Sequence, residues 1–148
     1  MNAEDVPAGP LLIDTDVFSY WYRNSGRHAE FERLAAGHDL AMSFASVGEA
    51  LAPTHSPKGS AELAAHIRLR LRQFVVLPFN AEVVERWAEL ANSLREGMKG
   101  KGVNDLWTAA CALSYGLPLM TNNLADFKKV SAAFPALALV HPDLEPPR

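Results

Sequence analysis

Two carboxylates follow the first apolar stretch of the chain. Residues 11–13 read Leu-Leu-Ile, and Asp14 and Asp16 come directly after them with Thr15 between. A short apolar run that ends in acidic residues is typical of a buried parallel strand, and open α/β sheets bind their ligands at the carboxyl ends of such strands. Isolated buried carboxylates are costly unless they are paired, hydrogen-bonded or bound to a metal. Other parts of the chain must therefore supply partners for these two.

Further polar side chains follow later predicted strands or open a predicted helix: Glu49, Asp105, Thr121, Asn123 and Asp126. Glu49 lies one helical turn beyond a strand predicted at 40–44, and the last three end or follow a strand predicted at 117–121. Asp105 opens an apolar helix, where the helix dipole favours a negative charge. Because a parallel sheet brings the carboxyl ends of its strands to one edge, we expect these side chains to meet there.

Three or four carboxylates in one pocket repel each other when ionised, and a divalent cation is the natural counter-charge. Oxygen ligands without histidine or thiolate favour Mg²⁺ or Mn²⁺ over zinc. A cation held in an acidic pocket activates water and stabilises the transition state of phosphoryl transfer. The residue types therefore indicate a nuclease or a phosphatase.

The elements that must position these residues alternate along the chain. Apolar runs predict strands at 11–14, 40–44, 74–78, 117–121 and 137–140. Helical spacing and helix-ending residues predict helices at 17–22, 27–36, 46–52, 61–73, 81–96, 103–115 and 127–134. Such alternation indicates an α/β fold with a mostly parallel central sheet and helices on both faces.

The length of 148 residues is close to the commonest size of one domain. Residues 1–10 are expected to form a flexible leader, residues 11–141 one nuclease domain, and residues 142–148 a tail. The leader lacks the basic and apolar regions of a signal peptide. Together with the single cysteine, Cys111, this predicts a cytoplasmic protein.

The net charge of −3 argues against a generally basic nucleic-acid coat protein, but it is compatible with an enzyme that holds nucleic acid in one groove. The single cysteine also excludes a cysteine-based zinc site and an intramolecular disulfide. Lys99 and Lys101 precede Asp105 and are candidates for contacts with a nucleic-acid phosphate, with a solvated loop as the alternative.

Four stretches resemble, in this order, the motifs of PIN-domain proteins, and within them those of the VapC-type toxins of bacterial toxin–antitoxin pairs. They are residues 11–16 (Leu-Leu-Ile-Asp-Thr-Asp), 43–51 (Ser-Phe-Ala-Ser-Val-Gly-Glu-Ala-Leu), 104–113 (Asn-Asp-Leu-Trp-Thr-Ala-Ala-Cys-Ala-Leu) and 119–127 (Leu-Met-Thr-Asn-Asn-Leu-Ala-Asp-Phe). Each motif alone is weak, and four in order are specific. The resemblance covers residues 11–141 and implies a three-layer PIN-like sandwich.

The resemblance also implies an activity and its residues. It implies a Mg²⁺-dependent endoribonuclease, with Mn²⁺ as a substitute, that cleaves RNA, is neutralised by a cognate antitoxin protein and forms a homodimer. Asp14, Glu49 and Asp105 would be the acidic triad, with Asp14 and Asp105 as the direct metal ligands. Thr121 would orient its neighbours through a hydrogen bond.

Two positions depart from the family pattern. Many members carry a fourth acid where this chain has Asn123, whose amide oxygen adds no charge. Asp126 is a candidate for the missing carboxylate, and which of these two side chains fills the fourth position stays open. The second departure is Asp16, where the family more often has serine or asparagine. Asp16 either adds charge to the site or points outward at the start of a helix.

Three alternatives stay open. Residues 11–16 also resemble the nucleophile motif of haloacid-dehalogenase-type phosphatases, but the chain is short of that family's later lysine and acidic pair. A PIN scaffold that has lost activity and acts as a binding protein is kept open by Asn123. Glu49 itself has a structural alternative, because Ser46 and Glu49 have the spacing of a helix capping box.

Overall fold

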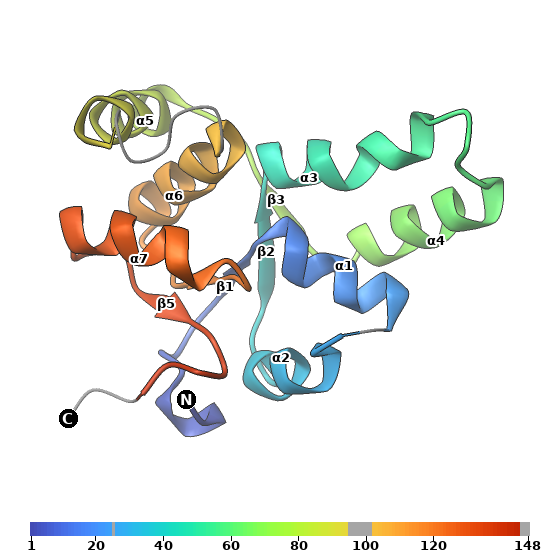
Figure 1. The fold of residues 1–148 in the computed structure, drawn as a ribbon, viewed down its shortest axis with the longest axis horizontal. Coiled ribbons are helices and arrows are strands. Elements are labelled where there is room, and N and C mark those ends of the chain that lie inside the picture. The colour runs from blue at the N-terminus through green and yellow to red at the C-terminus, as the bar shows by residue number, and fades with distance from the viewer. Residues whose placement is uncertain (25, 95–101, 146–148) are drawn as a thin grey trace.

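The fold is built on a five-stranded parallel sheet (Figure 1). The computed structural model describes residues 1–24, 26–94 and 102–145. Its strands are β1 (Leu11–Ile13), β2 (Leu40–Ser43), β3 (Val75–Leu77), β4 (Leu119–Met120) and β5 (Leu139–Val140). They lie in the order β3-β2-β1-β4-β5, and every neighbouring pair is parallel. The predicted α/β class is confirmed, and the sheet is parallel throughout.

Seven α-helices cover the sheet among the described residues, and they form a layer on each face. They are α1 (Thr15–Arg23), α2 (His28–Ala35), α3 (Phe44–Leu51), α4 (Ala61–Leu71), α5 (Ala81–Ser93), α6 (Val103–Tyr115) and α7 (Leu124–Ala133). Short 3₁₀ helices occur at Ala3–Asp5 and Ala52–His55. Figure 1 shows α1 to α4 on one side of the sheet and α5 to α7 on the other. None of these described helices is long and apolar enough to cross a membrane.

The side chains of β1 point alternately to the two faces of the sheet, and so contribute to the core under each helix layer. Leu11 and Ile13 belong to the core under α1 to α4, whereas Leu12 belongs to the core under α5 to α7. All three side chains are fully buried. A strand that is buried on both faces reads as a continuous apolar run, which is why residues 11–13 lack a polar alternation. β1 is therefore the centre of both cores as well as the support of Asp14.

Several helix ends follow directly from local sequence. The hydroxyl of Ser60 accepts a hydrogen bond from the backbone N–H of Leu63 at the start of α4, and Asn80 caps α5 through the N–H of Val83. Gly116 ends α6 with a left-handed φ of 66°, which glycine adopts without a steric penalty. The bounds of α6 agree with the prediction. α5 ends at Ser93, earlier than the predicted end at residue 96. Gly97, Lys99 and Lys101 lie outside the described residues.

The predicted capping box of α3 is wrong. The helix begins at Phe44, and its N-cap is Ser43, whose hydroxyl accepts a hydrogen bond of 3.1 Å from the N–H of Ser46. Ser46 is therefore the third residue of the helix, and Glu49 lies in its second turn, beyond any capping position. The structural alternative for Glu49 is removed, because the carboxylate is not needed to cap this helix.

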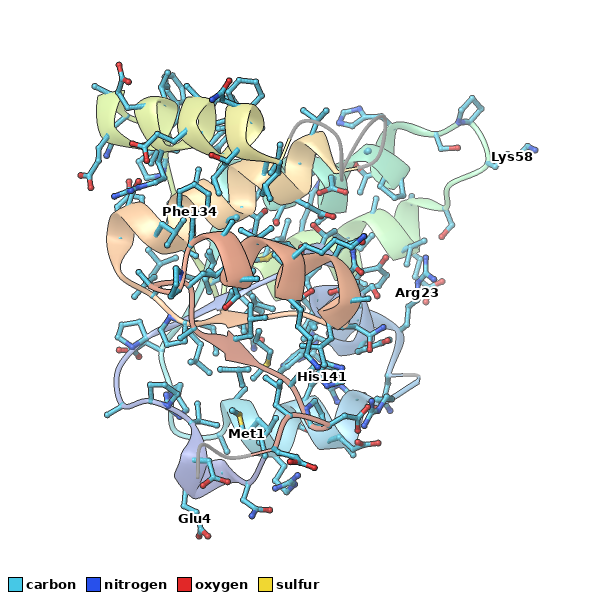
Figure 2. All side chains as sticks on the ribbon, turned by 60° about the vertical axis from the view of Figure 1, so that its left-hand side comes forward. Met1, Glu4, Arg23, Lys58, Phe134 and His141 are labelled. Carbon is cyan, nitrogen blue, oxygen red and sulfur yellow. The ribbon has the colours of Figure 1, made fainter. Side chains whose placement is uncertain are left out.

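Two residues of the predicted leader, Met1 and Val6, lie against the domain, and the flexibility of residues 1–10 stays a prediction. Val6 is buried in the core beside α2, and the N-terminal ammonium of Met1 donates hydrogen bonds to the carbonyls of Pro142 and Leu144. Met1 thus lies next to the chain that follows β5, as Figure 2 shows at the lower end of the molecule. The burial of Val6 supplies the physical reason for this docked arrangement.

Candidate active site

The strand order places the site. The chain runs from β1 outward to β3 and then crosses to β4 on the other side of β1, so the order reverses between β1 and β4. In open α/β sheets the ligand crevice lies at such a switch point, at the carboxyl ends of the strands. Asp14 directly follows β1 and Thr121 directly follows β4, and the N–H of Asp14 donates to the carbonyl of Met120 at 3.0 Å. The first predicted acid therefore lies at the switch point.

Asp14 is held by two hydrogen bonds in an almost closed environment. Its Oδ1 accepts from the N–H of Thr15 and its Oδ2 accepts from the hydroxyl of Thr121, both at 2.8 Å. Asp14 is 4% exposed and Thr121 is fully buried. Burial, followed by repulsion from Asp16, raises the pKa of Asp14 from 3.8 to about 8, although both hydrogen bonds oppose the rise. An anion at this position needs a positive partner.

Asp16 points toward the site rather than outward. Its Oδ1 accepts a hydrogen bond of 2.6 Å from the N–H of Val17 and one of 3.3 Å from the N–H of Asn122, which follows β4. Burial and repulsion from Asp105 raise its pKa. Sequence spacing alone does not fix the direction of this side chain, so its inward position is a finding of the structure.

Glu49 reaches the same edge from α3. The hydroxyl of Thr15 lies 3.3 Å from Oε1 of Glu49 and 3.5 Å from the carbonyl of Ser46, and donates to both. Partial burial, together with the charges of Asp105 and Asp16, raises the pKa of Glu49. Thr15 therefore orients Glu49, a role that the sequence did not single out.

Asp105 approaches from the first turn of α6. The Nδ2 group of Asn123 lies 3.5 Å from Oδ2 of Asp105 and donates a shorter bond of 2.9 Å to Oδ2 of Asp126. Burial and the charge of Asp126 raise the pKa of Asp105. Asp126 also forms an ion pair with Lys129 at 3.5 Å. Asn123 thus bridges two carboxylates, and its backbone N–H donates to Thr121 at 3.0 Å.

Three buried hydroxyl groups fasten α3 to α6 behind the acids. Ser43, Ser46 and Thr108 are fully buried, and their hydroxyl oxygens lie 3.1–3.2 Å apart in a closed triangle. Ser46 precedes Glu49 by one helical turn, and Thr108 follows Asp105 by one turn. The triangle therefore sets the spacing of the two helices that carry these acids. A threonine within an apolar run was the only sequence signal for it.

The donor set fits a hard divalent cation by its chemistry. Asp14, Asp16, Glu49 and Asp105 each have a raised pKa, and the causes in each case are burial and a neighbouring carboxylate. Carboxylate oxygens are the ligands that Mg²⁺ and Mn²⁺ prefer. Among the described residues, no three His, Cys, Asp or Glu side chains lie close enough together to enclose an ion as they stand. The charges of these carboxylates nevertheless act on one another.

The six predicted site residues converge at this edge of the sheet through hydrogen bonds or the action of their charges: Asp14, Glu49, Asp105, Thr121, Asn123 and Asp126. Their catalytic and metal-binding roles stay predictions. The structure adds Thr15, Asp16 and Thr108 to the residues that shape the site.

The chain is thus an open α/β protein with carboxylates at its switch point, the place where such folds bind their ligands. The sequence matches the family described as PIN domain over residues 11–133, and the chain belongs to this family. The predicted resemblance is confirmed. Membership of the PIN family excludes the haloacid-dehalogenase alternative, because the match extends through all four motif regions.

Named relatives agree with the family. The chain is 25% identical to Ribonuclease VapC1 of Haemophilus influenzae strain R2866 over 122 residues, which cover 81% of this chain and 91% of the relative. It is 37% identical to Ribonuclease VapC1 of Rickettsia felis over 57 residues, or 38% of this chain and 42% of that one.

Solved structures share the fold. The structure of VapBC-1 from nontypeable Haemophilus influenzae has a TM-score of 0.74 at 24% identity and covers 91% of this chain and 99% of its own. VapBC2 from Rickettsia felis, solved with a DNA fragment from its promoter, has a TM-score of 0.71 at 23% identity and covers 88% of this chain and 97% of its own.

Proposed function

We propose that this protein is a divalent-metal-dependent endoribonuclease and the toxin of a type II toxin–antitoxin module. The observation that carries the proposal is the convergence of Asp14, Glu49 and Asp105 at the switch point of a PIN-domain sheet. The names of the relatives, Ribonuclease VapC1, support the choice of RNA as the substrate. We further propose a cytoplasmic location, where cellular RNA is available as a substrate.

The chemistry of the site favours Mg²⁺, with Mn²⁺ as a substitute. All its candidate ligands are oxygen atoms, and hard oxygen ligands select these ions over zinc. Asp14 and Asp105 would hold the ion. When bound, the ion supplies an activated water and neutralises charge that develops on the phosphodiester.

The protein's own groups have separate tasks in this proposal. Thr121 holds the Asp14 carboxylate through its hydroxyl, so that the acid faces the site in one orientation. Glu49, held by Thr15, orients the attacking water in line with the scissile bond. Asn123 and Asp126 fix Asp105 from the side of α7. Together these contacts position the acids before RNA binds, which is the main contribution a protein makes to such chemistry.

The proposed partners are RNA, a small cognate antitoxin and a second copy of the chain. VapBC complexes from Haemophilus influenzae and from Salmonella typhimurium, both with TM-scores of 0.74, support an antitoxin partner. Co-expression with the protein encoded by the adjacent gene should relieve growth inhibition and yield a complex that co-purifies. The mass of the isolated chain, measured by light scattering, tests the homodimer.

The decisive experiment compares the wild type with Asp14→Asn on a panel of structured RNAs in Mg²⁺, in Mn²⁺ and in EDTA. Asp39→Asn is the matched control, because Asp39 is exposed and precedes β2 at the opposite edge of the sheet. We expect cleavage by the wild type and by Asp39→Asn with either metal, and none by Asp14→Asn or in EDTA.

The other outcomes are informative. Equal cleavage by the wild type and Asp14→Asn would overturn the assignment. No cleavage by any variant, combined with tight binding of the antitoxin, would instead identify a PIN scaffold that acts as a binding protein, an alternative that the neutral side chain of Asn123 keeps open.

A further inference from the structure

We propose that Asp16 is a fourth metal-binding carboxylate of this site and supplies negative charge on the β4 side, where Asn123 is neutral. The inference rests on the proposed metal-dependent function. It concerns a residue whose sequence position, second in α1, is equally that of an ordinary helix-capping acid. The contacts of its side chain decide between the two roles.

The first observation is the hydrogen bond that Asp16 makes across the switch point. Its bond to the N–H of Val17 stays within the first turn of α1, as a capping acid would. Its bond to the N–H of Asn122 reaches the segment that follows β4. A side chain that only capped α1 would have no reason to cross to another strand's end. Asp16 therefore lies between the ends of β1 and β4, the position that the fold assigns to a ligand.

The second observation is the set of charges that Asp16 faces. Of the charged side chains near Asp14, Asp16 repels its carboxylate most strongly, and Asp105 repels it less. The charge of Asp105 acts in turn on Asp16, and that of Asp16 acts on Glu49. The charge of Asp16 is thus coupled to all three members of the triad, just as that of Asp105 is coupled to the other two. A cation attracted by the triad is attracted by Asp16 as well.

The third observation concerns Asn123, which directly follows Asn122. Its Nδ2 group donates toward Asp105 and Asp126, so this end of the side chain offers the site hydrogen atoms rather than a lone pair. Because this amide is uncharged, the nearest anion that follows β4 is Asp126, which is already paired with Lys129. Asp16, bonded to the N–H of the preceding residue, places a carboxylate beside it.

The test moves the charge between the two positions. Asp16→Asn, Asn123→Asp and the double variant Asp16→Asn/Asn123→Asp are compared with the wild type for Mn²⁺ binding by isothermal titration calorimetry, and for RNA cleavage. Glu82→Gln is the matched control, because Glu82 is the second residue of α5 and is exposed. We expect Asp16→Asn to weaken Mn²⁺ binding about tenfold, the strength of one charge-assisted contact. The Mn²⁺ affinity of the double variant should return to within about threefold of the wild-type value. Glu82→Gln should bind Mn²⁺ as tightly as the wild type.

Asp14→Asn separates this inference from the proposed function. If Asp14→Asn loses Mn²⁺ binding while Asp16→Asn keeps it, the role of Asp16 is overturned and the proposed function stands. If Asp14→Asn also keeps wild-type binding, the metal-dependent function fails and the inference fails with it. If Asp16→Asn binds Mn²⁺ weakly and the double variant does not recover, the claim that Asp16 supplies the charge that Asn123 lacks is overturned. Circular dichroism at the binding temperature confirms that each variant compared is folded.

Discussion

The hydroxyl of Thr121 donates a hydrogen bond of 2.8 Å to Oδ2 of Asp14, and this bond joins the ends of β4 and β1 at the centre of the site. The bond favours the ionised carboxylate, whereas burial and the charge of Asp16 favour the protonated acid. Burial is the larger effect, so the pKa stays near 8. Thr121 therefore holds Asp14 closer to the charge state that a metal ligand needs.

Thr121→Val removes this donor and leaves a side chain of similar shape. Because the bond lowers the pKa of Asp14, its loss raises that pKa further, and less of the carboxylate is ionised at pH 7. A hydrogen bond to a charged group contributes about 1.5–3 kcal/mol, so we expect RNA cleavage at pH 7 to fall about tenfold or more. The rise of cleavage rate with pH should move to higher pH. Thr121→Ser keeps the hydroxyl and should restore the profile; an unchanged profile in Thr121→Val would contradict this role.

Thr108→Val tests the hydroxyl triangle behind the acids. The substitution leaves Ser43 and Ser46 buried with one partner fewer, and we expect a loss of about 1–3 kcal/mol in the free energy of unfolding. Because the triangle joins the helices that carry Glu49 and Asp105, we also expect kcat to fall about fivefold with little change in KM, a modest part of what misplacement can cost. Thr108→Ser should recover both quantities.

Two residues on the same helix provide controls for Thr108→Val. Cys111 is fully buried in α6, so Cys111→Ala lowers stability by leaving a cavity without touching the triangle. The hydroxyl of Ser114 is buried with no hydrogen-bond partner among the described residues, so Ser114→Ala should be nearly neutral. If kcat falls equally in Thr108→Val and Cys111→Ala, the effect follows stability and the positioning role is wrong.

The sequence predicted what local patterns determine. The bounds of α6 follow from its apolar run and from Gly116, and the caps of α4 and α5 follow from Ser60 and Asn80. The convergence of the acids follows from the rule that parallel strands end at one edge. Each of these inferences needs only neighbouring residues or the topology of the sheet.

The remaining features depend on contacts between distant segments. Ser43 and Ser46 are both acceptable N-caps by residue type, and the end of β2, fixed by its pairing with β1 and β3, selects Ser43. The direction of Asp16 depends on the N–H of Asn122, more than one hundred positions away in sequence. Thr108 resembles a core residue until its two serine partners are placed beside it. Local patterns contain none of this information.

Asp126→Asn tests whether Asp126 fills the fourth acidic position of the site. Asp126 is 39% exposed at its side chain and is paired with Lys129, so its charge is partly neutralised before it acts on Asp105. We expect Asp126→Asn to weaken Mg²⁺-dependent cleavage only about threefold, within the range of a half-exposed ion pair, and Asp105→Asn to abolish it. Metal titrations of cleavage rate would measure both. Equal loss in the two variants would make Asp126 a full member of the site.

Asp14 should also make the metal-free protein less stable as the pH rises. Its pKa is about 8 in the folded state and near 4 when unfolded, so the folded state holds the proton more tightly. This contribution to stability is fully present below about pH 4 and is lost as the pH rises through about 8. The raised pKa values of Asp16, Glu49 and Asp105 act in the same direction.

Asp14→Asn removes that titration and the cost of the buried charge. In EDTA at pH 8 we expect its melting temperature to exceed that of the wild type by about 5 °C, at roughly 3 °C per kcal/mol for a domain of this size. The difference should be small at pH 5, where the wild-type acid is protonated. Added Mg²⁺ should then stabilise the wild type at pH 8 but not Asp14→Asn, because the neutral amide does not replace the Asp14 carboxylate as a ligand of the ion. A wild-type stability that rises between pH 5 and pH 8 in EDTA, or one that Asp14→Asn leaves unchanged, would show that Asp14 is ionised without a cation and would remove the electrostatic argument for a metal at this position.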